Sequence, residues 1–319
     1  MSRFLGIDTS CYTTSVAVFD DKQGIVAEDR IVLSVKQGHR GLAQSEMVFQ
    51  HIRNLPILLS KIGEYILNIE GIGVSIFPRR RADSYMPAFL AGKSVAKAIS
   101  IAKDIPIYDF SHQENHALAA LRLAPNLWGQ PFYMMHVSGG TQDVLAVHWN
   151  GAIMSIEDLI HSKDITAGQF IDRVGVALGL SFPAGAKLEA LALEEKQKEY
   201  HVPHSKIKDA FSFAGPETQV ERDIKQGNIE KSAIAYGVLQ SVGDAFRQVL
   251  MAYPFQEGYP FIAVGGVMSN CYLRKVIQDI CEAKKLSPYF ADVKYSSDNA
   301  TGNAFGAYMR NRYESLHTS

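Results

Sequence analysis

Residues 4–19 read FLGIDTSCYTTSVAVF, and this stretch decides the fold. The apolar run Phe4–Asp8 predicts a buried strand, and the small and hydroxyl-bearing residues 9–14 predict a turn. The alternation over Ser15–Phe19 predicts a second strand, and Ile25–Val32 predicts a third. The chain therefore opens with a strand, turn, strand meander.

Helices and strands alternate after this meander. Amphipathic periodicity predicts helices over about 45–62 and 87–102, on either side of an apolar strand at Ile72–Ile76. Such alternation is typical of an α/β layer architecture.

A similar unit begins again at Phe132. The run FYMMHV is followed by the turn Ser138–Thr141 and by predicted strands at Val144–Trp149 and Ile153–Glu157. The repeated order predicts either an internal duplication or two unrelated hairpins of a common kind. Further helical patterns lie at 167–178, 186–195, 232–251, 270–283 and after residue 298, with a strand at 261–264.

Three turns rich in glycine and hydroxyl residues are candidate phosphate-binding elements. They are Asp8–Thr14 with Thr9 and Ser10, the turn Ser138–Thr141, and Gly265-Gly266 between a strand and a helix. Small side chains let backbone N–H groups approach phosphate oxygens, and a helix amino end favours an anion. One glycine turn is more often only a turn, so the series of three is what predicts nucleotide binding.

Composition excludes several classes of protein. The 319 residues are 47% hydrophobic, enough for one large or two medium domains. The 32 Lys and Arg nearly balance the 33 Asp and Glu, which excludes a large net charge. Cys11, Cys271 and Cys281 lack metal-module or disulfide-framework spacing, which favours a reducing compartment. No stretch has the length of a membrane span, so we expect a soluble, untargeted cytoplasmic protein.

The segment SHQENHAL, residues 111–118, places His112 and His116 four residues apart at the expected start of a helix. Both imidazoles then project from one face, which is the spacing of a metal-binding pair. Ten histidines in the chain make one such spacing weak evidence by itself.

Several ordered motifs resemble the TsaD family, whose members make threonylcarbamoyladenosine in tRNA and were formerly labelled O-sialoglycoprotein endopeptidases. The opening GIDTSCYTTS is similar to the family's phosphate hairpin, and SHQENH is similar to its metal-binding helix. The blocks VSGGTQ, FIDRVGVALGL with FPAGAKLEALA, FSFAG, VGGVMSNCYLR and YSSDNATGNAFGA follow in the family's order. The resemblance covers nearly the whole chain.

The resemblance implies the α/β fold of actin, sugar kinases and heat-shock chaperones, a duplicated ribonuclease H-like pair of domains with a central cleft. It implies a first domain of residues 1–109 plus about 298–319, and a second of 110–297. It also implies a divalent metal, iron or zinc, together with ATP, AMP or a carbamoyl-adenylate. The implied metal ligands are His112, His116 and Asp298, and the implied nucleotide-binding residues are Thr9, Ser10, Ser138, Gly139, Gly140, Thr141, Asp172, Gly185, Gly265, Gly266 and Asn270.

The chain departs from the family pattern in three places. Tyr12 and Thr13 stand where the family's opening hairpin has acids, and loss of a catalytic acid commonly costs several powers of ten in rate. The turn SGGTQ lacks the family's histidine. The family's glycine-rich GPG turn is replaced by a segment carrying Arg79, Arg80 and Arg81, which is either an anion-binding loop or a solvated surface turn.

We therefore expect a metal- and nucleotide-binding carbamoyltransferase that acts on tRNA. A catalytically silent, nucleotide-binding regulatory paralogue is the alternative, favoured by Tyr12 and Thr13. A metallopeptidase is the least favoured, because Glu114 lies about 200° around the helix from His112. The family also implies a related subunit or a second copy of the chain as partner, and no membrane partner.

Overall fold

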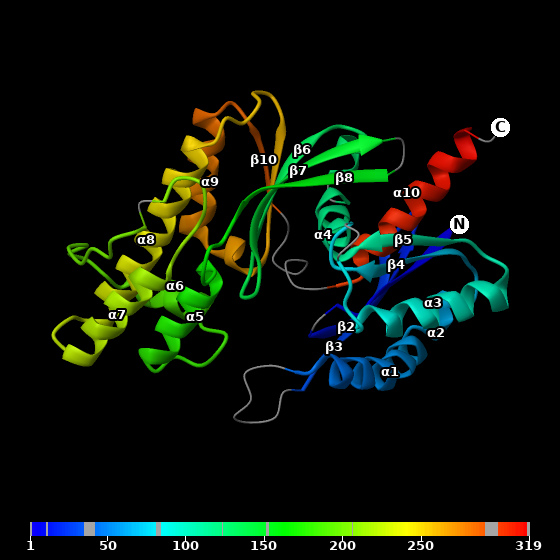
Figure 1. The fold of residues 1–319 in the computed structure, drawn as a ribbon, viewed down its shortest axis with the longest axis horizontal. Coiled ribbons are helices and arrows are strands. Elements are labelled where there is room, and N and C mark those ends of the chain that lie inside the picture. The colour runs from blue at the N-terminus through cyan, green and yellow to red at the C-terminus, as the bar shows by residue number, and fades with distance from the viewer. Residues whose placement is uncertain are drawn as a thin grey trace. The chain divides into compact units, whose positions relative to one another are not determined.

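The computed structural model describes residues 2–10, 12–34, 42–80, 84–122, 124–150, 153–205, 207–290 and 299–317. It forms two compact units (Figure 1). Unit 1 comprises Met1–Gly129, Trp149–Met154 and Asp298–Ser319, and unit 2 comprises Gln130–His148 and Ser155–Ser297. No helix in the described part of the chain has the length and apolar character needed to cross a membrane.

Unit 1 is built on a five-stranded sheet of order β3-β2-β1-β4-β5. Strand β1 pairs antiparallel with β2 and parallel with β4. Its strands are β1 (Arg3–Asp8), β2 (Thr13–Asp20), β3 (Gly24–Val32), β4 (Ile69–Phe77) and β5 (Ile107–Ser111). Its helices are α1 (Gln44–Lys61), α2 (Gly63–Ile66), α3 (Phe89–Lys103), α4 (His112–Leu121), the short η1 (Pro125–Leu127) and α10 (Thr301–His317).

Successive side chains along β1 point to opposite faces of this sheet, and each face is covered by different helices. Ile7 lies in the apolar core that includes Leu55 of α1 and Ala91 of α3. Gly6, one residue earlier, faces α10 so closely that an added Cβ would lie 2.2 Å from the Ala300 carbonyl oxygen. Glycine at this position therefore lets the C-terminal helix pack directly on the sheet.

Unit 2 repeats the same arrangement, with strand order β10-β9-β6-β7-β8. Strand β6 pairs antiparallel with β7 and parallel with β9, as β1 does with β2 and β4. Its strands are β6 (Phe132–Val137), β7 (Gln142–Asn150), β8 (Ile153–His161), β9 (Pro260–Val264) and β10 (Ser287–Phe290). Its helices are α5 (Ala167–Ala177), α6 (Gly185–Leu193), α7 (Ala214–Gln226), α8 (Lys231–Ala252), η2 (Gly266–Ser269) and α9 (Cys271–Ala283).

The equal strand order confirms the internal duplication, because each sheet places its first strand between an antiparallel hairpin and a parallel neighbour. The predicted α/β architecture is also confirmed. The first long segment of unit 1 ends at Gly129, whereas the expected boundary was residue 109. Helix α4 groups with unit 1 because it packs on α10, β4 and β5.

Candidate functional site

The predicted histidine pair lies at the start of α4. Ser111 is the N-cap of this helix, with its side chain accepting from the Glu114 N–H, and Glu114 in turn accepts from the Ser111 N–H. This capping box fixes the first turn, which carries His112. His112 and His116 follow one turn apart, and their Nε2 atoms lie 2.9 Å from each other.

Asp8, the last residue of β1, holds the first of these imidazoles. Its Oδ2 lies 3.1 Å from His112 Nδ1 and also accepts from the Ser10 hydroxyl at 3.0 Å and the Asn115 amide at 3.4 Å. Asp8 is fully buried, and its Oδ1 has no hydrogen-bond partner among the described residues. A buried carboxylate oxygen without a partner is costly unless a cation lies near it.

These residues are of the types that hold a divalent metal ion. The Nε2 atoms of the two imidazoles lie 2.9 Å apart, and a carboxylate lies at the far nitrogen of one ring, as is usual for histidine ligands. The expected third ligand, Asp298, lies outside the described residues. Within the described ranges no group of three or more His, Cys, Asp or Glu side chains is placed to hold a metal.

The arginine segment is engaged within unit 1. Arg80 binds the Glu114 carboxylate through two nitrogens, with Nε–Oε1 and Nη2–Oε2 distances of 3.1 and 2.8 Å, and it also donates to the Asp109 carbonyl. Its bidentate contact is therefore made to a side chain of the α4 capping box. The Arg79 backbone N–H donates to the Ser84 hydroxyl, and Arg81 lies outside the described residues.

The first phosphate turn also directs its side chains inward. The Thr9 hydroxyl donates to the Ala88 carbonyl and accepts from the Gly92 N–H, so it fixes the start of α3. The Ser10 hydroxyl is used by Asp8. Tyr12 is 40% exposed and Thr13 is buried, and neither residue supplies the carboxylate found at these positions in the family pattern.

Unit 2 contains a cavity of about 480 Å³, a size within the usual range for small-ligand sites. It lies beside the second predicted phosphate turn, the start of α5 and the start of α6. Its lining comprises Ser138, Gly139, Gly168, Ile171, Asp172, Phe182, Pro183, Gly185, Ala186, Glu189, Gly266, Val267, Ser269 and Asn270. Six of the predicted nucleotide-binding residues are among them.

Asp172 presents one carboxylate oxygen to this cavity. Its Oδ1 accepts from the Ala184 N–H at 2.8 Å, whereas Oδ2 has no hydrogen-bond partner in the described part of the chain. Oδ2 would lie 3.9 Å from a Cβ added to Gly139, so the carboxylate and the glycine turn are close neighbours. A free carboxylate oxygen in a small-ligand cavity is suited to accept hydrogen bonds from sugar hydroxyls.

Two further lining residues supply a donor and a second acceptor. Asn270 caps α9 by accepting from the Leu273 N–H through Oδ1, which leaves its amide nitrogen as the free end. Glu189 accepts from the Cys271 N–H at 2.7 Å through Oε1, and its Oε2 has no described partner. No side chain caps the start of α6 at Gly185, so that helix end also offers N–H groups.

The remaining turn residues do not line the cavity. The N–H groups of Gly140 and Thr141 both donate to the Ser138 hydroxyl, which closes their own turn. Gly265 has a φ of 104° and lies against β6, where an added Cβ would be 2.1 Å from the Val137 carbonyl oxygen. Its glycine is therefore required by strand packing, whereas Gly266 reaches the cavity.

Comparison with known proteins identifies the family. The profile described as tRNA N6-adenosine threonylcarbamoyltransferase matches residues 85–305. The chain belongs to the TsaD family. The tRNA N6-adenosine threonylcarbamoyltransferase of Thermotoga neapolitana is 30% identical over 97% of this chain and 94% of its own length.

Solved structures show the fold of this TsaD member. Component A of the Acidaminococcus fermentans (R)-2-hydroxyglutaryl-CoA dehydratase has a TM-score of 0.57 at 16% identity, covering 98% of this chain and 100% of that one. A ROK family glucokinase from Streptomyces griseus has a TM-score of 0.51 at 11% identity, covering 96% and 99%. These matches confirm the predicted actin-like and sugar-kinase-like duplicated fold.

Sequence reasoning missed Asp8 as the partner of His112, and it missed Asn115 and Glu189. Asp8 and Asn115 meet only because β1 and α4 are neighbours in space, 107 residues apart in sequence. Glu189 carried a usable signal, since it lies four residues after Gly185 and therefore on the same face of α6.

Proposed function

We propose that this TsaD member binds an adenine nucleotide in the cavity of unit 2 and a divalent cation at the histidine pair of unit 1. It would transfer a threonylcarbamoyl group from its adenylate to the adenosine next to the tRNA anticodon. The observation that carries this proposal is the cavity wall, where Asp172 and Glu189 offer free carboxylate oxygens and Asn270 offers an amide.

The wall suggests a role for each side chain in holding the nucleotide. The free oxygens of Asp172 and Glu189 accept hydrogen bonds from ribose hydroxyls, and the Asn270 amide donates to the nucleoside. Ser138 and Gly139 contact the phosphate or acyl end, because their turn has little side-chain bulk. Phe182, 72% exposed at the cavity, offers an aromatic face to the base.

In unit 1 the chain's own residues prepare the cation site. Asp8 orients His112 through Nδ1, so that Nε2 is directed toward His116, and Asp298 would be the third ligand. A bound iron or zinc ion would act as a Lewis acid toward a carbonyl or phosphate oxygen. The capping box and Arg80 hold the first turn of α4 and therefore the position of His112.

The silent regulatory paralogue is the second candidate, and the residues at the first turn favour it. Neither Tyr12 nor Thr13 places a carboxylate there, so the turn lacks the family's acids. Replacing Tyr12→Asp and Thr13→Glu together separates the candidates. An altered enzyme changes its rate or acceptor with a threonylcarbamoyl-adenylate donor, whereas a silent paralogue gains no turnover.

The arrangement around Glu114 disfavours peptide hydrolysis. Its carboxylate accepts from the Ser111 N–H at 2.6 Å and from two Arg80 nitrogens. A general base must have a free oxygen within reach of the attacking water. Glu114 is therefore a capping residue.

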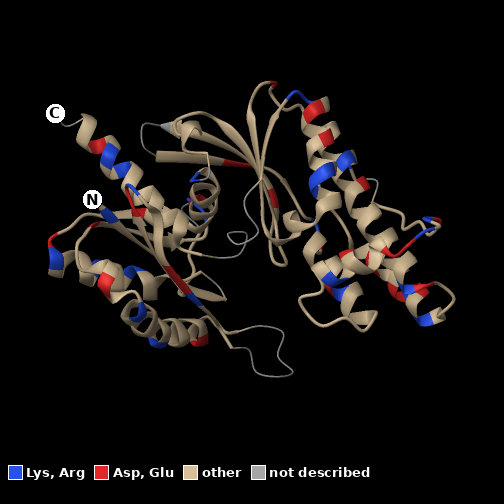
Figure 2. Cartoon of the chain, turned by 180° about the vertical axis from the view of Figure 1, so that it is seen from behind, with Lys and Arg blue, Asp and Glu red and all other residues tan. Residues whose placement is uncertain are grey.

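A tRNA acceptor would have to be bound by local groups. Basic and acidic residues are interspersed along the helices of unit 2 (Figure 2), and the net charge of the chain is −1. Nonspecific attraction of nucleic acid requires a positively charged face. We expect this chain to bind tRNA together with a partner, which is either a related family subunit or a second copy of the chain.

The test uses the purified chain. Calorimetry should detect AMP or ATP binding, and elemental analysis should find about one iron or zinc per chain. Labelled threonylcarbamoyl-adenylate with unmodified tRNA should give threonylcarbamoyladenosine. A chain that binds neither nucleotide nor metal would overturn the proposal. A chain that binds both but forms no threonylcarbamoyladenosine, either alone or with related family subunits, would favour the regulatory paralogue.

A further inference from the structure

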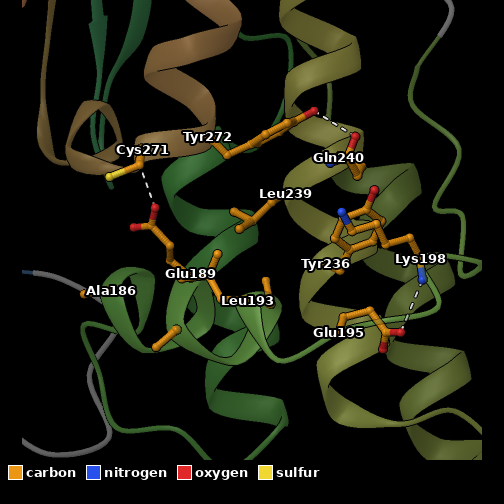
Figure 3. A pocket seen from close by; sticks show the side chains of 12 residues that line it. Ala186, Glu189, Leu193, Glu195, Lys198, Tyr236, Leu239, Gln240, Cys271 and Tyr272 are labelled. Carbon is orange, nitrogen blue, oxygen red and sulfur yellow. Dashed lines mark hydrogen bonds between the residues drawn. The ribbon is translucent and has the colours of Figure 1, made fainter.

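A second cavity in unit 2, of about 630 Å³, has no part in the proposed reaction. It lies between α6, α8 and the start of α9 (Figure 3). Ala190 and Leu193 line it from α6, Leu239 and Gln240 from α8, and Tyr272 from α9. It is large enough for a nucleobase or nucleoside.

This cavity and the nucleotide cavity share two lining residues. Glu189 and Ala186 line both of them. Asn270 lines the first and the next residue, Cys271, lines the second, and the Cys271 N–H donates to Glu189 Oε1 at 2.7 Å (Figure 3). A ligand in either cavity therefore meets the same side chain, whose Oε2 is available for a hydrogen bond.

The hydrogen bonds of α8 and α9 fix a donor in the second cavity. Arg247 only donates, so the Tyr272 hydroxyl accepts from it at 3.3 Å and gives its own proton to Gln240 Oε1 at 2.8 Å. Burial raises the pKa of Tyr272, so this hydroxyl keeps its proton at neutral pH. The Gln240 amide must then present Nε2 elsewhere, and Nε2 has no partner among the described residues.

Apart from the charged side chains of Glu195 and Lys198, the rest of the lining is apolar or aromatic. Leu239 is buried, whereas Leu193 is 82% exposed. Tyr236 offers its ring, over which the Lys198 ammonium lies at 5.9 Å from the centroid. The cavity thus combines apolar and aromatic side chains with the Gln240 amide and the Glu189 carboxylate, and it also carries the charged Glu195 and Lys198.

We propose that this cavity is a second ligand site, which binds a planar heteroaromatic compound of nucleobase type. A ring nitrogen or carbonyl of the ligand accepts from Gln240 Nε2, an amino group donates to Glu189 Oε2, and the ring packs against Leu239 and Tyr236. Because Glu189 lines both cavities, occupancy of this site changes nucleotide affinity, and the nucleotide changes the affinity of this site equally. Only this coupling rests on the proposed function.

The probe is 9-methyladenine, which has the amino group and ring acceptors but no ribose hydroxyls for Asp172. Calorimetry on the full chain should detect its binding. Ala190, which lines only this cavity, is replaced in Ala190→Trp, and the variant should lose 9-methyladenine binding while AMP still binds. Ala98→Trp, on an exposed position of α3, is the matched control and should change neither. Gln240→Leu should weaken binding about fivefold through loss of one hydrogen bond.

Alkylation of Cys271 gives a second measurement. Cys271 is exposed at this cavity, whereas Cys281 is buried and burial raises its pKa to about 12, so Cys281 serves as an internal unreactive control. Peptide mass spectrometry should show that 9-methyladenine slows iodoacetamide labelling of Cys271 several-fold, and that Gln240→Leu reduces this protection at equal probe concentration. No binding at millimolar probe, or equal binding to wild type and Ala190→Trp, overturns the site. Absence of AMP binding would overturn the proposed function and leave the 9-methyladenine result standing.

Discussion

The turns that follow β1 and β6 occupy the same place in two sheets of equal order, yet their polar groups are used differently. After β1, Thr9 bonds to the α3 region and Ser10 bonds to Asp8, whose carboxylate holds His112. After β6, Ser138 closes its own short turn and leaves Gly139 at a cavity. The two copies thus share their strand order, while one turn orders a histidine pair and the other lines a cavity.

A glycine in the sheet of unit 1 and a glycine in the turn after β6 should differ in their contribution to stability. In unit 1, a Cβ added to Gly73 would lie 2.0 Å from the Asn303 carbonyl oxygen of α10. Gly73→Ala should therefore destabilise the protein by at least about 3 kcal/mol, because backbone must move. Gly140→Ala, where a Cβ would meet nothing within 4 Å, should change stability by less than about 0.5 kcal/mol. Urea denaturation measures both, and equal effects would contradict the packing account.

The nucleotide half of the comparison depends on Asp172. Asp172→Asn keeps an oxygen for the Ala184 N–H but removes the charged acceptor that faces the cavity. AMP affinity should fall about 10- to 100-fold, the loss expected for a charged hydrogen bond. Calorimetry measures it, and metal content is the control, which should not change. If Asp172→Asn loses metal but keeps its AMP affinity, then Asp172 belongs to the metal site and not to the nucleotide cavity.

The cation half depends on Asp8. Asp8→Asn should weaken divalent metal binding about 10-fold or more, because His112 loses the carboxylate that orients it. Titration with Co²⁺, followed by its absorption spectrum, measures this without any enzyme assay. Asn54→Ala is the matched control in unit 1, since among the described residues its amide bonds to the Thr14 hydroxyl and not to Asp8 or the histidines, and it should leave Co²⁺ affinity unchanged. Unaltered Co²⁺ binding in Asp8→Asn would remove Asp8 from the site.

Local patterns explain what the sequence predicted. The apolar run of β1, the alternation within β2 and the four-residue spacing of the histidines are encoded in nearby residues, so the meander and the shared helix face could be derived from them. The short strands β5 and β10 were not predicted, since their stability comes from parallel neighbours distant in sequence. Helix α7 was missed as well, because its start at Ala214 has no side-chain cap.

The site shows the same division between local and distant information. Asp172 and Gly185 could be assigned only through the family's motif order, since a carboxylate on a helix has no pattern of its own. Asp8 and His112 are 104 residues apart, and no periodicity connects them. The role of Arg80 could not be derived either, because its partner Glu114 belongs to a different element.

The smallest expected effect concerns acids that close turns in the two units. Asp20, at the end of β2, is buried, and burial alone raises its pKa. Hydrogen bonds from the Lys22 and Gln23 N–H groups and from the Arg3 guanidinium lower the pKa by more, so the net pKa lies below the ordinary 3.8. Its ionised form therefore stabilises the folded state above pH 3.8, and this contribution is lost as the pH falls through the lowered folded-state pKa.

Asp20→Asn should cost about 1 kcal/mol at pH 7, and its difference from wild type should shrink as the pH falls below 3.8. Glu195→Gln in unit 2 is the comparison: hydrogen bonding by the Gln197 N–H lowers the Glu195 pKa, but this side chain is solvated, so its effect should be smaller. Urea denaturation between pH 3 and 7 measures both. A constant Asp20→Asn difference across that range would show that the buried turn is stabilised by packing and not by the charge of its carboxylate.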